Sequence, residues 1–541
     1  MLKNFFAGYF PTNDFLPRVS RLAITFLILI LTGCGSGNGN NTNSNTASFT
    51  LQTGTTQVNT YPGGSSQVTL SVQGSGGFSG TVTVTPQLQS GITTIPASLS
   101  LASGQSGAFA FSVSPSVPGG DVVVNFKATA GNITASASSV LHVALENPDF
   151  VPATMDLPIV RINTENAAPI VSKVDYLNAT IVIDPNGSIS SYALSSTLKI
   201  RGRGNSSWDL MPKKPYKLKF DNKTSMLGMP ADKEWALLAN YSDKTLLRNT
   251  VAFELSRRLG MVYTPRSSFV EVFLNNHYIG TYLLCETIKI AKNRVNITAL
   301  SDTDITDDVV SGGYLLEANF RLDEDTNWIT NQNVPVSMHD PDPIAPQQLS
   351  YIQQYLQTTE NSVYSGASED DPDGYGQFID VDSFINWFIV NELFKNNDAN
   401  FWASVWMYKD RDKPLFIGPV WDFDIGAGNI NYNGSDNPSG WRIHDGPWYG
   451  KLFADPVFAG KVKARWNAVK AAQIDTLGNY IDQNVTALTQ SQQNNFQRWI
   501  ILNSYVWPNS EIAGSYQGEV TFLKQWLQRR TAWMDAAINA Q

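Results

Sequence analysis

The sequence predicts an α+β protein in which an N-terminal β-sandwich precedes one large mixed domain. Residues 49–148 carry short apolar runs that alternate with polar residues at every second position, the pattern of half-buried strands. From about residue 150 charged residues return, and the first half of this larger region keeps a strand pattern. The last part of the chain has aromatic and apolar residues at helical spacing.

Composition excludes several classes of protein. The 541 residues sum to a net charge of −9, which argues against a general nucleic-acid binder, because such proteins need a basic surface. Two cysteines exclude a disulfide scaffold, and four widely spaced histidines show no metal-ligand spacing, so a zinc hydrolase is not expected. Cys285 lies in an apolar, strand-like run and is interpreted as a buried, inert thiol.

The N-terminus is interpreted as a targeting segment, residues 1–33. An apolar run at residues 22–32 follows two arginines and is too short to span a bilayer, which is typical of a signal peptide. The run ends in Leu-Thr-Gly-Cys, which resembles the bacterial lipoprotein box. The resemblance implies cleavage before Cys34, lipidation of its thiol and membrane attachment through the lipid chains. Gly35 is not the aspartate of an inner-membrane retention signal, so the expected location is the cell envelope, at the outer membrane or cell surface.

Two segments separate this leader from the large domain. Residues 34–48 are almost entirely Gly, Ser, Asn and Thr, a composition that predicts a flexible tether. Residues 49–148 predict an Ig-like β-sandwich, with strands bounded by Gly, Ser and Pro but without the cysteine pair of antibody domains. No chemical group in it indicates catalysis. It is interpreted as a stalk, with a ligand-binding module as the alternative.

Residues 150–541 are interpreted as one α+β domain in two lobes. Residues 268–284 predict a hairpin that turns at Asn275 and Asn276. A helix is expected to begin at Ser242 as N-cap and to stop at Gly260, since leucine and valine recur every four residues between them. Further helices are expected at residues 382–395 and 519–539.

The first of three stretches that indicate chemistry is rich in glycine and basic residues. Residues 201–208 read Arg-Gly-Arg-Gly-Asn-Ser-Ser-Trp, and glycines there free backbone N–H groups to turn toward an anion, beside Arg203. A basic strand follows, in which Lys217 and Lys219 share one face. One of these two lysines is expected to line the site, and Lys217 is favoured. The alternative is a solvated strand face.

The second and third stretches carry carboxylates. Asp398 lies among amides in a polar loop at the end of a predicted helix, where a carboxylate can accept a hydroxyl proton. Asp422 and Asp424 flank a phenylalanine after a short apolar strand, and glycines follow. Carboxylates of this kind suit Mg²⁺ together with substrate oxygens. The alternatives are a helix C-cap for the loop and a turn with backbone-capping acids for the pair.

Taken together, these stretches resemble the CotH family of spore-coat protein H-like atypical kinases. The segments that carry the resemblance keep the family's order: residues 201–208, 213–221, 242–249, 280–286, 312–317 and 418–429. The resemblance implies a two-lobed, protein-kinase-like fold, ATP and Mg²⁺ as cofactors, and phosphoryl transfer to serine hydroxyls of a protein substrate whose identity the sequence does not give.

The resemblance also implies roles for individual residues. Lys217 looks like the phosphate-contacting lysine, Arg248 like a supporting charge and Glu286 like a residue near the nucleotide. Asp398 would be the base of the catalytic loop, and Asp422 and Asp424 would bind the metal. The family's second metal ligand, an asparagine after the loop aspartate, has no clear counterpart, and Ser404 or Asn400 would replace it. Lys217, Asp398 and Asp422 are therefore expected to converge on one triphosphate.

Two other functions remain open at the level of sequence. The kinase-like domain could be a non-catalytic, pseudokinase-like module that binds a partner or a surface polymer. A glycosidase would use two carboxylates about 5–9.5 Å apart, but the segments around Asp422 and Asp424 do not resemble such enzymes.

Overall fold

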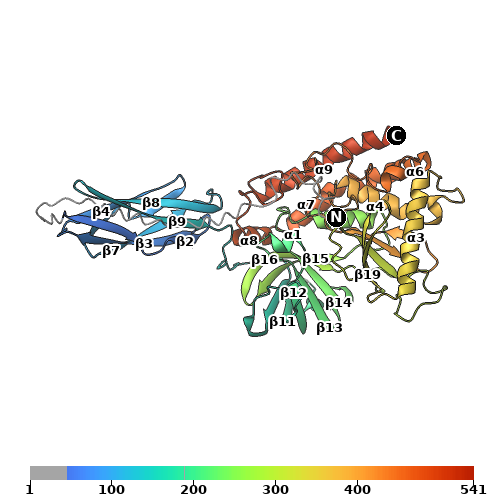
Figure 1. Cartoon of the computed structure of the whole chain (residues 1–541), viewed down its shortest axis with the longest axis horizontal. Helices are drawn as coiled ribbons and strands as arrows, with labels where there is room; N and C mark the ends of the chain where they lie inside the picture. Colours follow the sequence, from blue (N-terminus) through green and yellow to red (C-terminus); the bar gives the residue numbers. More distant parts are fainter. Residues whose placement is uncertain (1–45, 188) are drawn as a thin grey trace, which may run out of the picture.

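The computed structural model describes residues 46–187 and 189–541 (Figure 1). The predicted leader, Cys34 and nearly all of the predicted tether lie outside the described residues. In the part that is described, no helix combines the length and the apolar character that crossing a bilayer requires.

A β-sandwich forms the N-terminal part of the described chain and stands apart from the rest of the molecule (Figure 1). Inward side chains of both sheets form one core, in which Phe109, Phe111 and Phe126 contact one another. The predicted period-two alternation is confirmed. The first sheet has the order β1 (Ser48–Thr53), β3 (Ser65–Ser75), β7 (Ser106–Val113), β5 (Ile92–Ile95). The second has the order β2 (Gln57–Thr60), β9 (Ile133–Val143), β8 (Gly120–Ala130), β4 (Thr81–Gln87), β6 (Leu99–Ala102).

The segment that follows the sandwich, residues 146–156, contacts the C-terminal helix α8 (Ser491–Arg498). Glu146 forms an ion pair of 3.1 Å with Arg498. Asp156 accepts hydrogen bonds from the backbone N–H groups of Gln490 and Ser491 at the start of this helix. These contacts join segments more than 300 residues apart, so the connection behind the sandwich is held by tertiary contacts.

A closed seven-stranded barrel follows. Alternate side chains fill its interior, among them Leu218, Trp235 and Leu284, and the barrel has a core of its own. The strand order is β10 (Ile159–Thr164), β11 (Leu177–Asp184), β12 (Leu194–Gly202), β13 (Tyr216–Met226), β14 (Met229–Leu238), β16 (His277–Glu286), β15 (Ser267–Leu274), and β15 returns to β10. The predicted hairpin is confirmed as β15–β16, and Asn275 and Asn276 turn it with φ of 50° and 65°.

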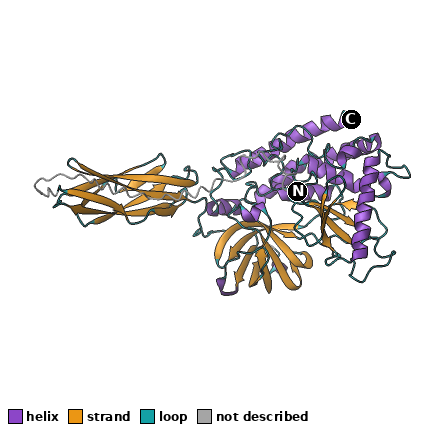
Figure 2. Cartoon of the chain, viewed as in Figure 1, coloured by secondary structure: helices purple, strands orange, loops and turns teal. Residues whose placement is uncertain are grey.

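The remainder is a five-stranded sheet covered by helices (Figure 2). The sheet has the order β18 (Asn327–Ile329), β19 (Pro335–Asp340), β17 (Tyr314–Ala318), β20 (Val405–Lys409), β21 (Leu415–Ile417). The helices of the mixed domain are α1 (Ser206–Asp209), α2 (Arg248–Arg258), α3 (Pro346–Ser365), α4 (Val381–Leu393), α5 (Tyr449–Leu452), α6 (Pro456–Val469), α7 (Leu477–Ala487), α8 and α9 (Tyr516–Asn539). The described chain is thus α+β, as predicted.

One predicted helix start is wrong. The helix expected from Ser242 begins only at Arg248, because residues 242–247 form a buried loop in which Leu246 has a φ of 64°. The two other helices agree with the sequence within three residues. Asp380 caps α4 by accepting the N–H of Ser383, and Ser515 caps α9 by accepting the N–H of Gly518.

Candidate active site

A polar cavity of about 250 Å³ lies where the end of the barrel meets the five-stranded sheet. The barrel contributes the loop after β12 and the end of β14. The sheet contributes β17, β20 and the loops next to them. The charged side chains that line it are six carboxylates and two guanidiniums: Glu317, Asp323, Glu324, Asp398, Asp422, Asp424, Arg203 and Arg321. Such an excess of negative charge favours a bound cation.

The three aspartates named from the sequence line this cavity together. Burial by the surrounding protein raises the pKa of Asp398, and the nearby Asp422 carboxylate raises it further. Burial also raises the pKa of Asp422, although its side chain opens to solvent and Arg203 opposes the shift. The pKa of Asp424 is raised well above its ordinary value by burial and then by Asp422, Asp243 and Asp398. A cation among these groups would lower all three pKa values.

Two cavity residues have unfavourable backbone conformations. Asp422 has a φ of 67° and Ser404 a φ of 59°, in the left-handed region that non-glycine residues seldom adopt. The Ser404 hydroxyl donates to Oδ2 of Asp422 at 3.4 Å. Backbone strain of this kind persists where the surrounding structure fixes it, and it gathers at functional sites.

Two guanidiniums from different parts of the chain supply the positive charge. Arg203, in the glycine-rich loop after β12, lies 5.5 Å from the ring centre of Trp421. Burial lowers the pKa of Arg203, and the attraction of Asp422 opposes this. Arg321 follows β17, and its Nη1 lies 2.9 Å from the side-chain amide of Asn205 in the glycine-rich loop. The barrel loop and the sheet therefore meet across the cavity.

The loop that carries Asp398 comes after α4 and is fixed by amides. Asn397 donates from Nδ2 to Oδ1 of Asp398 at 3.0 Å, and the Asp398 N–H donates to the Asn396 side chain at 3.3 Å. Arg442 donates to the Asn397 carbonyl at 2.8 Å. This agrees with the sequence expectation that neighbouring amides orient the carboxylate.

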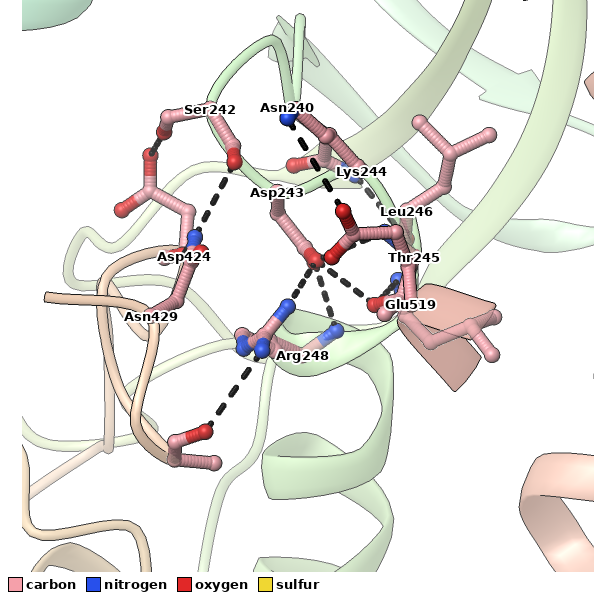
Figure 3. A network of polar contacts seen from close by, with 12 residues as sticks. Asn240, Ser242, Asp243, Lys244, Thr245, Leu246, Arg248, Asp424, Asn429 and Glu519 are labelled. Carbon is pink, nitrogen blue, oxygen red and sulfur yellow. Dashed lines mark hydrogen bonds and ion pairs between the residues drawn. The ribbon is translucent and has the colours of Figure 1, made fainter. Parts of the chain in front are cut away.

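A buried polar network adjoins the cavity through Ser242 and Asp424 (Figure 3). Asp243 accepts hydrogen bonds from the Arg248 backbone at 2.8 Å and from its guanidinium at 2.6 Å, and both side chains are fully buried. Arg248 also donates to the carbonyl of Gly426 at 3.0 Å, two residues beyond Asp424. Ser242, in the same loop, donates to Asp424 at 3.4 Å. Arg248, predicted as a charge in the site, therefore lies outside the cavity lining and holds the Asp424 segment.

Two other predicted residues lie elsewhere. Lys217 is not among the residues that line the cavity, because it points outward from the barrel wall, with Nζ 3.0 Å from Glu234. Arg203, from the neighbouring loop, provides the positive charge in its place. Glu286 does end a strand, as expected. Its buried carboxylate forms ion pairs with Arg266 at 3.0 Å and Arg294 at 3.3 Å, and Glu286 is not among the residues that line the cavity.

Sequence reasoning missed Glu317 as a site residue. One of its oxygens accepts the N–H of Ser404 at 3.0 Å, and the other lies 2.8 Å from Nε2 of His339. Glu317 thus fixes the strained Ser404 next to Asp422. Only the family resemblance could have indicated Glu317, since this residue ends the segment 312–317 that resembles the CotH family. Ser404, and not Asn400, lines the cavity.

Comparison with protein families identifies the mixed domain. The family model described as CotH kinase protein matches residues 200–534. The chain belongs to the CotH kinase family. Membership confirms the resemblance read from the sequence, and the family implies ATP use. A search of curated proteins gave no match. Within the described residues, no group of three or more His, Cys, Asp or Glu side chains has the geometry of a preformed metal site.

The CotH chain is similar to several solved structures, but the sequence identities and TM-scores are low. The E. coli chaperone DraB is 12% identical over 27% of this chain and 96% of its own, with a TM-score of 0.16. The PapD-like domain 7 of human CEP192 is 11% identical over 20% of this chain and 92% of its own, with a TM-score of 0.14. Domains 4–9 of the surface layer protein SbsC are 11% identical over 34% of this chain and 30% of their own, with a TM-score of 0.14. TM-scores this low carry no conclusion about function.

Proposed function

We propose that this protein is a lipid-anchored envelope kinase whose CotH domain transfers the γ-phosphoryl group of ATP to serine or threonine hydroxyls of a protein. The observation that carries the proposal is the convergence of Asp398, Asp422 and Asp424 with Arg203 on one cavity. Phosphoryl transfer depends mainly on positioning and on charge neutralisation, and these groups supply both.

The donor set of the cavity fits Mg²⁺. Carboxylate oxygens are the ligands that this cation prefers, and one or two of them suffice when phosphate oxygens complete the shell. Asp422 and Asp424 would hold it, with the Ser404 hydroxyl beside them. When bound, the cation neutralises charge on the phosphate oxygens. A site completed by substrate is consistent with a protein that has no preformed cluster of three ligands among its described residues.

The other residues of the cavity take separate roles. The guanidiniums of Arg203 and Arg321 bind phosphate oxygens, a task for which their planar donors are suited. Asp398 accepts the proton of the acceptor hydroxyl while the hydroxyl oxygen bonds to the γ-phosphorus of ATP. The bond between the γ-phosphorus and the β–γ bridging oxygen breaks, and ADP leaves. Burial raises the pKa of Asp398 and so strengthens it as a proton acceptor, and a bound cation would reduce this effect.

Nucleotide binding tests the metal part of the proposal. Wild-type protein should bind a non-hydrolysable ATP analogue more tightly with Mg²⁺ than without it, in isothermal titration. Asp422→Asn should lose most of this gain, with a fall in affinity of about tenfold or more, equivalent to about 1.4 kcal/mol. Asp370→Asn, which removes an exposed carboxylate elsewhere, is the matched control and should behave as wild type. Absence of binding at every Mg²⁺ concentration would instead favour the non-catalytic binding module.

The anchor is tested separately. In a bacterial host, wild-type protein should take up labelled palmitate and fractionate with membranes, because lipid chains at Cys34 would supply the attachment. Cys34→Ser should be unlabelled and should leave the membrane fraction. Wild-type protein that stays unlabelled and soluble would refute lipidation and would leave the kinase proposal untouched.

A further inference from the structure

The outer wall of the barrel carries a basic face on strands β12 and β13. In the antiparallel register, Lys199 lies directly opposite Lys219, and Arg201 lies directly opposite Lys217. All four side chains point away from the barrel interior, and Lys199 and Lys219 are exposed. We call these four residues the basic face. It stands on a chain whose net charge is −9.

The arrangement is unfavourable for folding. Like charges placed directly opposite each other on neighbouring strands destabilise a sheet. Glu234 offsets part of the charge, because it forms an ion pair with Lys217 and lies directly opposite Lys219 on β14. Asp221 lies at the edge, two residues beyond Lys219. The ring of Tyr176 lies 4.9 Å from the Arg201 guanidinium and 5.9 Å from the Lys219 ammonium, so it bridges the two strands. Fold stability alone does not account for two opposed cation pairs.

The basic face leads toward the candidate active site. Lys199, Arg201 and Arg203 occupy every second position along β12 and the loop after it, and Arg203 lines the cavity. Alternate residues of a strand are about 6.6–6.8 Å apart, which is also the spacing of same-side residues in an extended peptide. An extended acidic segment can therefore match this row while a residue beyond its end reaches the cavity.

We propose that the basic face binds an acidic peptide segment of the acceptor protein and so guides the acceptor hydroxyl to Asp398. The identity of the ligand as an acceptor rests on the proposed kinase function. The binding of an acidic peptide does not, because it follows from charge and register alone. The continuity of the row with the cavity favours a peptide over a membrane surface.

Binding of a fluorescent oligoglutamate peptide to the full-length protein, followed by anisotropy without nucleotide, tests the proposal. Wild-type protein should bind it, and the affinity should fall steeply with added salt. The double variant K199S/K219S should lose about tenfold in affinity or more, equivalent to about 1.4 kcal/mol. Lys217 is left intact, because its ion pair with Glu234 would be lost and would leave that carboxylate without its partner. The control K292S/K413S removes two exposed lysines elsewhere and should bind as wild type does.

The outcomes separate this proposal from the kinase proposal. Equal oligoglutamate affinity in both double variants would overturn the basic face as a docking surface, whatever the transfer activity. Binding to anionic phospholipid vesicles but not to oligoglutamate would overturn it in favour of a membrane contact. The melting temperature of K199S/K219S should stay close to that of wild type, since the variant relieves the repulsion between Lys199 and Lys219 and loses the attraction of Lys219 to Glu234. A lost affinity in a protein of undiminished stability therefore reports binding and not misfolding.

Discussion

Replacing Asp398 by asparagine should lower phosphoryl transfer by about 10²–10⁴-fold, the usual contribution of a positioned general base. The asparagine keeps the size of the side chain and removes the proton acceptor. Nucleotide affinity should change little, because Asp398 is assigned to the acceptor hydroxyl and not to the metal. The measurement is incorporation of labelled phosphate from ATP into protein, together with the affinity for a non-hydrolysable analogue.

Asp323→Asn is the matched control, because it removes a carboxylate that also lines the cavity but has no assigned role in proton transfer. It should retain transfer within a few fold. In wild-type protein, transfer should fall as the pH drops through the pKa of Asp398, which burial raises and a bound cation would lower, since the protonated carboxyl no longer accepts a proton. Equal incorporation by wild type and Asp398→Asn would remove this residue from its role.

Local patterns predicted the elements that depend on local physics. The sandwich, the hairpin at Asn275 and Asn276, and helices α4 and α9 arise from alternation, turn residues and capping residues. The helix start at Ser242 was wrong because the hydrogen bonds of the Asp243 carboxylate stabilise a different local structure. Asp243 captures the Arg248 side chain and the N–H groups of Thr245 and Arg248, which stabilises a buried loop where the leucine spacing indicates a helix.

In the site, too, local sequence patterns indicated some residues and could not indicate others. Three carboxylates and Arg203 were found because each lies in a polar segment whose residue types indicate phosphate or metal chemistry. For Lys217, period-two alternation predicted that it shares a face with Lys219, but it could not tell which side of a closed barrel that face takes. Glu317 fixes Ser404 from a strand 87 residues away, and a contact of that range leaves no local pattern.

Replacing Arg248 by methionine should cost about 3–5 kcal/mol of unfolding free energy, the range found when one partner of a buried ion pair is removed. Arg248 and Asp243 are both fully buried and 2.6 Å apart, so the variant leaves an uncompensated carboxylate in the interior. It also removes the donor to the Gly426 carbonyl, and with it a support of the Asp424 segment. Urea denaturation gives the free energy, and Mg²⁺-dependent ATP-analogue binding reports the state of the segment.

Arg257→Met on the same helix is the control. Arg257 pairs with Glu254 at 3.1 Å on the surface, where an ion pair contributes about 0–1 kcal/mol. The double variant Asp243→Asn/Arg248→Met should be more stable than Arg248→Met alone, because it no longer buries a lone charge. If Arg248→Met and Arg257→Met unfold with equal losses, the buried pair does not stabilise the loop. If the double variant recovers stability but not Mg²⁺-dependent binding, Arg248 positions Asp424, and its role reaches beyond holding the fold together.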